Sequence, residues 1–249
     1  MAWLLIDNSN TRTKFALGDA NGLLDWRGVI PTQEISPDTL TDCLQGVTYE
    51  AAIICSVVPE KAIMLGKWLD GRVPNHFLNH LSPLGMAIDY PNPSQIGADR
   101  LANAAGVLTR HRVPAIIIDF GTAVTFDVIS AEPAYCGGAI APGLGAMSGY
   151  LTCKTAMLPE IELVEPPSAI GKSTVHAMQV GAVIGYRGLV KEILAQICKE
   201  LPGHPAIIAT GGDAALIAKG LPEIDAVDAD ITLDGLRQVA VRLFSNSAR

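Results

Sequence analysis

The feature that most constrains the fold of this chain is an internal repeat. The stretch IIIDFGTAVTFDV at 116–128 has a near copy, LLIDNSNTRTKFAL, at 4–17. Each copy begins with a short apolar run that ends in an aspartate, Asp7 or Asp119, and then passes through a turn-prone tripeptide into a second run. This pattern predicts strand, tight turn and strand in both copies. Such a corner brings together a carboxylate, backbone N–H groups and hydroxyls, which are groups that bind metals and phosphates.

The simplest alternative is a pair of unrelated hairpins, because Asp and Thr most often cap the turns in which they lie. A single hairpin would leave that interpretation in place. The two copies are in register, however, since Thr13 and Thr125 hold equivalent places, and each copy lies near the start of a chain half. We therefore predict a duplicated domain, with a nucleotide held between the two halves.

The composition limits the classes of protein to which the chain can belong. Its 249 residues allow one large or two modest domains, and 49% hydrophobic residues with 24 Gly and 16 Pro indicate a compact protein with many turns. A net charge of −7 argues against a general nucleic-acid surface, because there is no basic excess to neutralise a phosphate backbone. A small anionic ligand needs only a local positive site, so this charge does not exclude nucleotides.

The sequence also gives an expectation for the compartment. The first apolar run stops at Asp7, too early for a signal peptide, and Arg187 breaks the longer run at 180–190, so we expect no membrane span. The five cysteines have no CxxC spacing and are odd in number, which fits free thiols in a reducing compartment better than disulfides or zinc. We expect a cytoplasmic protein without nucleic-acid or membrane partners.

Strand and helix patterns alternate along the chain and predict an α/β sheet covered on at least one face. Two prolines within three residues make 89–95 a loop. After the first hairpin we expect a third strand up to residue 30, with the turn at 18–21. Further strands are predicted at 51–58, 75–79, 115–118 and 206–210, and helices within 31–49 and at 62–69, 97–111, 174–200, 214–216 and 235–244.

Several motifs on these elements have both a structural and a functional interpretation. Asp99 and Arg100 lie in the opening turn of the helix at 97–111, where an acid is favourable against the helix dipole, and for an isolated Asp-Arg pair that structural role comes first. The double glycine Gly211-Gly212, between a strand and a helix, is a reasonable place for a nucleotide. The glycine-rich segment 136–151 lacks the spacing of a dinucleotide fingerprint and is a weak signal.

Two other glycine patterns lie at or near the helix at 174–200. Gly181, Gly185 and Gly188 give the helix at 174–200 a flat face, which favours close packing against another element or a second subunit. The GKS at 171–173 resembles part of a phosphate-binding Walker A loop. That loop requires a glycine five residues earlier, where this chain has Pro166, and a preceding strand, where it has a proline-rich segment. We therefore reject a P-loop here, although Lys172 and Thr174 could meet a ligand by another route.

Four stretches together resemble the type III pantothenate kinase family. They are DNSNTRTK at 7–14, YPNPSQIGADR at 90–100, DFGTAVTFD at 119–127, and IGKST before AMQVG at 170–181. SVVP at 56–59 and TGGDA at 210–214 also fit. No single stretch is decisive, but the set is specific because order and spacing match from end to end.

The resemblance implies a fold, a reaction and a set of ligands. The fold would be that of the actin-like and hexokinase-like superfamily, with two ribonuclease H-like α/β domains, here 1–113 and 114–249, and the active site in the cleft between them. The reaction would be transfer of the ATP γ-phosphoryl group to the primary hydroxyl of pantothenate, the first step of coenzyme A synthesis. Family members are homodimers that use a divalent cation such as Mg²⁺ with ATP, and a monovalent cation, K⁺ or NH₄⁺.

Residue by residue, the resemblance also implies roles. Asp99 resembles the base that takes the substrate hydroxyl proton, and Asp119 the ligand of the monovalent cation. The pantothenate contacts would be Tyr90, Gly97, Ala98, Asp99, Arg100 and Thr174, the last from the partner subunit. The ATP contacts would be Asp7, Asn8, Ser9, Asn10, Thr11, Lys14 and Thr122.

The chain departs from the family at Ser9, where the pattern Asp-x-Gly-Asn has glycine. If that position needs a positive φ, serine costs roughly 1 kcal/mol or more, and otherwise it only adds a hydroxyl. The change leaves open a second interpretation, a nucleotide-binding regulatory member of the superfamily without turnover. A third is another sugar or acid kinase, or a phosphatase, on the same scaffold. The joint presence of Asp99, Arg100 and Lys14 favours the kinase, because a pure binder has no need for the base.

Overall fold

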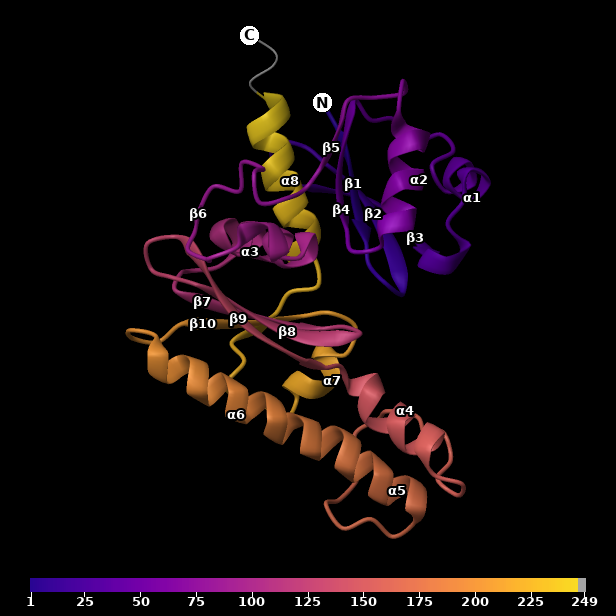
Figure 1. Ribbon diagram of the computed structural model, residues 1–249, viewed down its shortest axis with the longest axis vertical. Coiled ribbons are helices and arrows are strands. Elements are labelled where there is room, and N and C mark those ends of the chain that lie inside the picture. Colours follow the sequence, from indigo (N-terminus) through magenta and orange to yellow (C-terminus); the bar gives the residue numbers. More distant parts are fainter. Residues whose placement is uncertain (246–249) are drawn as a thin grey trace. The chain divides into compact units, whose positions relative to one another are not determined.

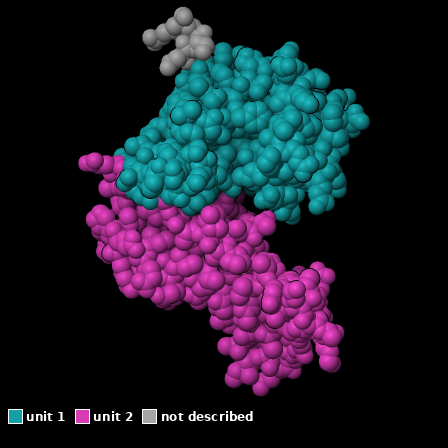
Figure 2. Space-filling model, in the orientation of Figure 1, with its two compact units in different colours: residues 1–112, 133–136, 230–249 teal, residues 113–132, 137–229 magenta. Residues whose placement is uncertain are grey.

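The chain forms two compact units in a computed structural model that describes residues 1–245 (Figure 2). The first unit contains residues 1–112, a short piece at 133–136 and the C-terminal segment from residue 230. The second contains 113–132 and 137–229. The change of unit at Val113 lies next to the domain boundary expected from the sequence, whereas the two later segments of the first unit fall within the expected second domain.

The first unit is built on a five-stranded sheet in the order β3-β2-β1-β4-β5. β1 is antiparallel to β2 and parallel to β4, and all six of its residues are buried, as its continuous apolar sequence requires. The predicted hairpin, third strand and buried fourth strand are confirmed. The strands are β1 (Trp3–Asn8), β2 (Arg12–Gly18), β3 (Leu23–Pro31), β4 (Ala51–Ser56) and β5 (Asn75–Phe77).

Helices cover this sheet, and two of them pack closely together (Figure 1). α3 (Ala98–Arg110) and α8 (Ile231–Phe244) touch through Gly106 and Gly235, where a Cβ would collide with a backbone carbonyl of the opposite helix. α8 also packs on β1 and β4. α1 (Pro37–Cys43) and α2 (Pro59–Leu69) contribute Leu40, Leu65 and Leu69 to an apolar core with β1, β2 and β4.

Several predicted bounds in this unit were wrong. α8 begins four residues before the predicted start and α2 begins at Pro59, a residue whose fixed φ suits the first helical position. Within 31–49 only α1 is α-helical, after a short 3₁₀ turn, η1 (Thr32–Glu34). The expected loop at 89–95 follows the two-residue strand β6 (Ala87–Ile88) and ends in a 3₁₀ turn, η2 (Pro93–Gln95).

The second unit repeats this plan. Its strands run in the order β11-β10-β7-β8-β9, and β7 is antiparallel to β8 and parallel to β10, as β1 is to β2 and β4. Asp119 pairs with Thr125 in the hairpin. The strands are β7 (Ala115–Phe120), β8 (Ala123–Ile129), β9 (Ala134–Pro142, whose first residues belong to the first unit), β10 (Ala206–Thr210) and β11 (Ala226–Val227). The shared strand order is the architecture expected of a duplicated domain.

A long helix spans the second unit (Figure 1). It consists of α5 (Thr174–Gln179), a π-helical turn at Val180–Ile184 and α6 (Gly185–Glu200), and the Ser173 side chain caps its start. Tyr186, Val190 and Leu194 of α6 join the apolar core over β7, β8 and β10. α7 (Ala214–Ala218) follows β10, and α4 (Leu144–Lys154) lies in the glycine-rich segment, where no helix was predicted. None of the helices in residues 1–245 is both long and apolar enough to cross a membrane.

Candidate active site

The first corner of the repeat gathers charge around Asp7. This residue is almost fully buried near the end of β1 and pairs with Lys14 of β2 across the hairpin. Its Oδ1 accepts a hydrogen bond from the Ser9 hydroxyl at 2.8 Å, and its Oδ2 lies 3.6 Å from the Lys14 ammonium. Lys14 remains partly exposed. The corner thus presents an ordered carboxylate, a hydroxyl and a cation, which suits it to phosphate groups and their metal ion.

Ser9 fits its turn without backbone strain. No residue other than glycine has a positive φ within the described chain, so serine occupies this position in an ordinary conformation. The N–H of Ser9 closes the turn on the carbonyl of Arg12 at 3.3 Å. Of the other predicted ATP contacts, Asn10 and Thr11 are exposed in the turn, whereas the side chain of Asn8 is fully buried beneath it. The conditional cost expected for serine here therefore does not arise.

Asp99 lies in the first turn of α3, two residues after the N-cap Gly97. Burial raises the pKa of the Asp99 carboxyl above its ordinary value, and the nearby negative charge of Asp7 adds to this rise. The N–H of Arg100, which donates to Asp99 Oδ1 at 2.8 Å, acts in the opposite direction. A Cβ at Gly97 would lie 2.5 Å from Asp99 Oδ1, so a side chain there would displace this carboxylate from its present position. A carboxylate with a raised pKa beside the corner is suited to accept a proton.

Tyr135 organises the predicted pantothenate residues. It is fully buried and belongs to the short piece of the first unit at 133–136. The ring of Tyr90 meets its ring edge-on, with centroids 6.2 Å apart, and the Arg100 guanidinium lies 5.8 Å from the ring centroid. β6 pairs with the start of β9, and the N–H of Asp89 donates to the Tyr135 carbonyl at 2.9 Å. Sequence reasoning missed Tyr135, because nothing local distinguishes it from a core residue.

The second corner of the repeat is packed by two glycines. Gly211 follows β10 with φ +93°, and a Cβ there would lie 2.6 Å from Asp119 Oδ1. Gly143 donates its N–H to the Thr122 carbonyl at 3.1 Å, and a Cβ there would collide with the same turn. Thr122 itself is exposed, and Asp119 is half-buried at the end of β7. The Gly-Gly segment predicted to receive a nucleotide is therefore built directly against Asp119.

Two polar groups beside this corner were not predicted. Asp213 begins α7 directly after the double glycine, and burial raises the pKa of its carboxyl. The Tyr186 hydroxyl is buried and has no hydrogen-bond partner among the described residues. Burial, with a smaller effect of the Asp213 charge, raises the pKa of Tyr186 to about 12. Asp213 is part of the TGGDA stretch seen in the sequence, but its burial and raised pKa could not be deduced without the fold.

Thr174 is exposed at the first position of α5. The loop before it folds back on the helix through His176, whose Nδ1 accepts from the Lys172 N–H at 3.2 Å and whose Nε2 lies 3.0 Å from the Ser168 carbonyl. Glu165, earlier in the same loop, accepts two hydrogen bonds from the guanidinium of Arg187 of α6, at 2.7 and 2.6 Å. No strand precedes the GKS in residues 155–173, which agrees with rejection of a P-loop.

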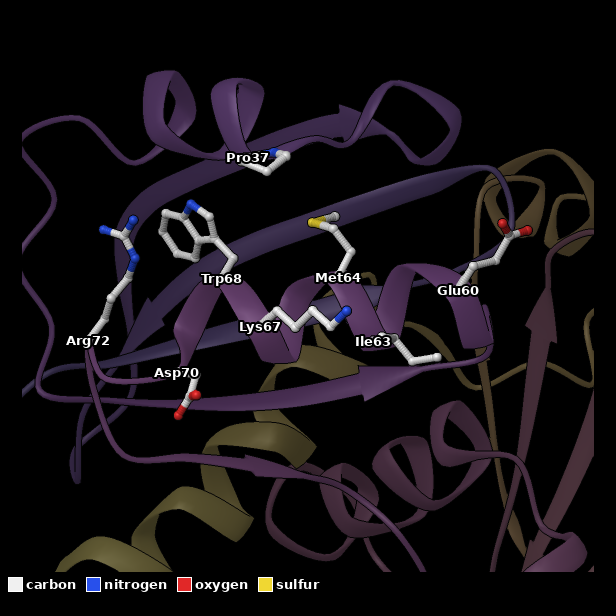
Figure 3. A pocket seen from close by; sticks show the side chains of 8 residues that line it. All are labelled: Pro37, Glu60, Ile63, Met64, Lys67, Trp68, Asp70 and Arg72. Atoms are coloured by element: carbon white, nitrogen blue, oxygen red, sulfur yellow. The ribbon is translucent and has the colours of Figure 1, made fainter.

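A surface pocket lies away from all these residues. It has a volume of about 620 Å³ and is lined by Pro37 of α1, by side chains of α2 that include Met64 and Trp68, and by Asp70 and Arg72 just after α2 (Figure 3). The Arg72 guanidinium lies 4.6 Å from the centre of the Trp68 ring. None of the predicted catalytic, substrate or ATP residues lines it.

Comparison with known proteins identifies the family. A family model described as type III pantothenate kinase matches residues 3–196. The chain belongs to the type III pantothenate kinase family. It is 58% identical over 240 residues to a type III pantothenate kinase from Akkermansia muciniphila, covering 96% of this chain and 98% of the relative. It is 43% identical over 238 residues to one from Methylacidiphilum infernorum, covering 95% and 87%.

Solved structures support the fold assigned to this family member. The activator of the 2-hydroxyisocaproyl-CoA dehydratase from Clostridium difficile, with bound ADPNP, matches with a TM-score of 0.56 and 12% identity, covering 99% of this chain and 96% of that one. Sugar kinases are also among the similar structures. At such identities the likeness shows the fold alone. The predicted class, an α/β protein with two domains of the actin-like ATPase and sugar-kinase type, is confirmed.

Proposed function

We infer that this protein transfers the γ-phosphoryl group of ATP to pantothenate and so catalyses the first step of coenzyme A biosynthesis. The observation that carries this inference is the family match along nearly the whole chain. As a kinase of this family it uses ATP with a divalent cation. Asp99 lies close enough to Asp7 for the charge of Asp7 to raise its pKa. This placement supports Asp99 as the base of that reaction.

We propose Asp99 as the residue that accepts the proton of the pantothenate hydroxyl. The substrate oxygen forms a bond to the γ-phosphorus, the bond from that phosphorus to the bridging oxygen of ADP breaks, and the hydroxyl proton passes to the Asp99 carboxylate. The transition state of phosphoryl transfer is loose, so the base chiefly orients the attacking oxygen. A carboxyl with a raised pKa holds the proton better than an ordinary one, which assists this transfer.

The first corner supplies the charge that phosphoryl transfer requires. In this proposal Lys14 and the turn at Ser9, Asn10 and Thr11 contact the ATP phosphates, whereas Asn8, a predicted contact, is fully buried and supports the turn from beneath. The hard oxygen donors Asp7 and Ser9 suit a divalent cation such as Mg²⁺, which neutralises the phosphate charge when bound. The matching corner of the second unit would contribute Thr122 to the nucleotide and Asp119 to a monovalent cation, K⁺ or NH₄⁺.

The substrate is assigned to the start of α3 and its neighbours. Arg100 offers a forked pair of donors that suits the pantothenate carboxylate, and its position beside Tyr135 limits its freedom. Tyr90 is oriented by the same ring, and Gly97 and Ala98 bring backbone close to the substrate. Thr174 would complete the contact from the partner subunit.

A homodimer, proposed here from the family resemblance, finds support in one helix face. Gly181, Ile184, Gly185 and Gly188 are all exposed on the long helix, and open space surrounds the Cβ position at each of the three glycines. Ile184 is 39% exposed despite its apolar side chain. A flat, partly apolar face allows two helices to approach closely. The compartment we propose for the dimer is the cytoplasm.

Incubation of the purified protein with ATP, Mg²⁺, K⁺ and pantothenate tests the reaction, with 4'-phosphopantothenate measured by mass spectrometry. We expect product in amounts equal to the ADP formed, and much less when choline replaces K⁺. Sugars and other hydroxy acids serve as controls for the acceptor. Tight binding of ATP or pantothenate by calorimetry, with no product under any of these conditions, would assign the chain to the regulatory class instead.

A further inference from the structure

A continuous set of side-chain hydrogen bonds runs beneath the first corner, and no role has yet been given to it. Its ends are the backbone N–H at the N-cap of α2 and the carbonyl of Ser9 in the turn. Ser56 is half-buried, and the three side chains that follow it are deeply buried, with Asn8 and Thr13 at 0% and Thr32 at 3% exposure. The successive groups are Val58 N, Ser56 Oγ, the Asn8 amide, Thr13 Oγ1, Thr32 Oγ1 and Ser9 O, separated by 3.2, 2.6, 2.7, 3.0 and 2.7 Å.

Hydrogen counting gives this set a single direction. Each hydroxyl carries one hydrogen, and that of Thr32 is donated to the Ser9 carbonyl, so Thr13 must donate to Thr32. Thr13 in turn accepts from the Asn8 amide nitrogen, whose oxygen accepts from Ser56. The reversed arrangement would leave the Ser9 carbonyl without the Thr32 donor. Reversal is therefore unfavourable, because it removes a short hydrogen bond from the partly buried Ser9 carbonyl.

Thr32 holds the turn at two points. Its hydroxyl binds the carbonyl of Ser9, and its N–H donates to the carbonyl of Thr11 at 3.0 Å. The segment around Thr32 is itself held, since Lys61 of α2 donates to the carbonyls of Gln33 at 3.2 Å and Ile35 at 3.1 Å. Thr32 lies outside every motif that identified the family, so its contribution is visible only in the fold.

The hydrogen bond from Thr32 fixes the orientation of the peptide group between Ser9 and Asn10. In a trans peptide the C=O and N–H point in opposite directions, so a Ser9 carbonyl turned inward toward Thr32 directs the Asn10 N–H outward. Asn10 is exposed, and its N–H has no hydrogen-bond partner within residues 1–245. Were the peptide to rotate, a carbonyl oxygen would face the phosphates in place of a donor and would repel them.

We propose that Thr32 is a positioning residue for the ATP phosphates. It keeps the Ser9 carbonyl turned away from the ligand and the Asn10 N–H turned toward it, and the hydrogen bonds from Ser56 through Asn8 and Thr13 keep Thr32 in its donating orientation. This inference rests on the proposed binding of ATP at the first corner. It gives the SVVP stretch a function, because the Ser56 hydroxyl donates to the Asn8 amide oxygen at 2.6 Å, closer than its other acceptor, the Val58 carbonyl at 3.3 Å, and so favours this orientation of the amide.

Thr32→Val tests the proposal, because valine keeps the branched shape and the backbone N–H but loses the hydroxyl. We expect the Kd for Mg²⁺-bound AMPPNP, measured by calorimetry on the full chain, to rise about tenfold, the change that follows from losing one hydrogen bond of ordinary strength. The KM for ATP should rise similarly, while the KM for pantothenate stays within about twofold. Thr32→Ser restores the hydroxyl and should restore both ATP constants.

The matched control is Thr232→Val, which removes another buried threonine hydroxyl, bound to the Asn103 amide oxygen at 2.6 Å. It should lower thermal stability comparably without weakening AMPPNP binding. Adenosine, which has no phosphates, should bind Thr32→Val and the wild type equally. Equal AMPPNP affinity in Thr32→Val and the wild type, or an equal loss in Thr232→Val, would overturn the proposal.

Ser56→Ala alters the opposite end of the same hydrogen-bonded set and so affects the Ser9 carbonyl indirectly. It provides a second test if Thr32→Val does not fold. Without the Ser56 hydroxyl the Asn8 amide is free to reverse, after which Thr13 donates to Asn8 and Thr32 is no longer oriented toward Ser9. We expect a weaker loss of AMPPNP affinity, about threefold. An unchanged affinity would count against the proposal. These measurements need only nucleotide binding, so a wild-type protein that binds AMPPNP but phosphorylates no pantothenate would contradict the proposed reaction and leave this inference standing.

Discussion

The carboxylate of Asp99 is useful to the reaction and unfavourable to the fold. Burial and the charge of Asp7 raise its pKa, so the folded protein disfavours the ionised form that a base requires. The protonated form contributes stability that is fully present below the ordinary carboxyl pKa of about 3.9 and is lost as the pH rises through the higher folded-state pKa. At neutral pH the ionised residue therefore destabilises the native state.

Asp99→Asn separates these two effects. The amide oxygen can still accept the Arg100 N–H, so we expect an intact fold, loss of kcat by at least about a hundredfold, and a higher melting temperature than the wild type at neutral pH. The difference in melting temperature should shrink as the pH falls toward the acidic range, where Asp99 is protonated. Thermal melts from acidic to neutral pH measure it. A variant that is less stable than the wild type at neutral pH would show that the favourable interaction with the helix N-terminus outweighs burial.

Ser9 is the position at which the chain departs from the family pattern. The structure predicts whether a return to glycine raises or lowers the stability of the fold. Because Ser9 has no positive φ and its hydroxyl donates to Asp7, Ser9→Gly should lower the free energy of unfolding by about 1–2 kcal/mol. Activity should persist within a few-fold, since the family pattern has glycine here. Ser9→Ala removes only the hydroxyl and separates its effect from that of the backbone. Chemical denaturation supplies the numbers, and a stabilised glycine variant would mean that the serine is strained.

At the residue scale, sequence reasoning could propose the acidic corners but not what surrounds them. Asp7 and Asp119 can be recognised in the sequence because they lie in the repeat, and Asp99 because it lies in a motif. Tyr135 and Thr32 have no such signal. Tyr135 meets Tyr90 and Arg100 only because β6 pairs with β9, and Thr32 reaches Ser9 only because β3 pairs with β2. Contacts of this kind depend on long-range register, which a single sequence does not contain.

Among the elements, buried strands were the most predictable part of the fold. β1, β4, β7 and β10 are continuous apolar runs bounded by turn residues, and each lies where it was predicted. α4 was missed because its glycines and polar residues obscure the spacing of Leu144, Met147 and Leu151, which pack against the apolar clusters of the second unit. The π-helical turn at Val180–Ile184 was missed as well, since helical spacing alone cannot distinguish it from α-helix.

The exposed glycines of the long helix allow the proposed dimer to be tested. Gly185 is exposed and open at its Cβ position, so Gly185→Arg fits the folded subunit and improves its helix propensity by up to about 1 kcal/mol. If the glycine face joins two subunits, the added side chain should convert the dimer into a monomer. Light scattering after gel filtration measures the mass, and circular dichroism verifies the fold.

Gly149→Arg is the matched control for that experiment. Gly149 is exposed on α4, outside the long helix, and open space surrounds its Cβ position as well. It adds the same charge and bulk, and should leave the mass of the assembly unchanged. Dissociation by both variants would point to a general effect of the added charge, and persistence of the dimer in Gly185→Arg would place the subunit interface elsewhere.

At the scale of the whole molecule, the two sheets share the order of five strands, the second sheet having β6 as an additional edge strand, and each has an aspartate near the end of its first hairpin strand. Duplication explains this common plan, and the different side chains at the two corners suggest how the copies diverged. Asp7 is paired with a cation and a hydroxyl, whereas Asp119 lies against the Gly211 turn. One copy is thus suited to phosphate chemistry and the other to a nucleotide contact and a cation.

The proposal that Thr174 acts in the partner's site makes a prediction about mixed dimers. Asp99→Asn and Thr174→Ala should each be nearly inactive when purified alone. In a heterodimer of the two, the Thr174→Ala subunit keeps its own Asp99 and receives Thr174 from its partner, so one of the two sites is complete. Random mixing makes half of the dimers heterodimers, and activity should recover to roughly a quarter of the wild-type value.

Mixing Asp99→Asn with Lys14→Ala is the control. Both residues belong to the first unit, so no combination of those subunits assembles a complete site, and the mixture should stay inactive. The measurement is pantothenate phosphorylation after subunits are exchanged by mild denaturation and refolding. Recovery with Thr174→Ala but not with Lys14→Ala would assign Thr174 to the partner's site. Failure of both mixtures, with exchange verified by a mass tag on one subunit, would mean that Thr174 serves its own subunit or none, because only a residue supplied in trans can be restored by a partner that carries it.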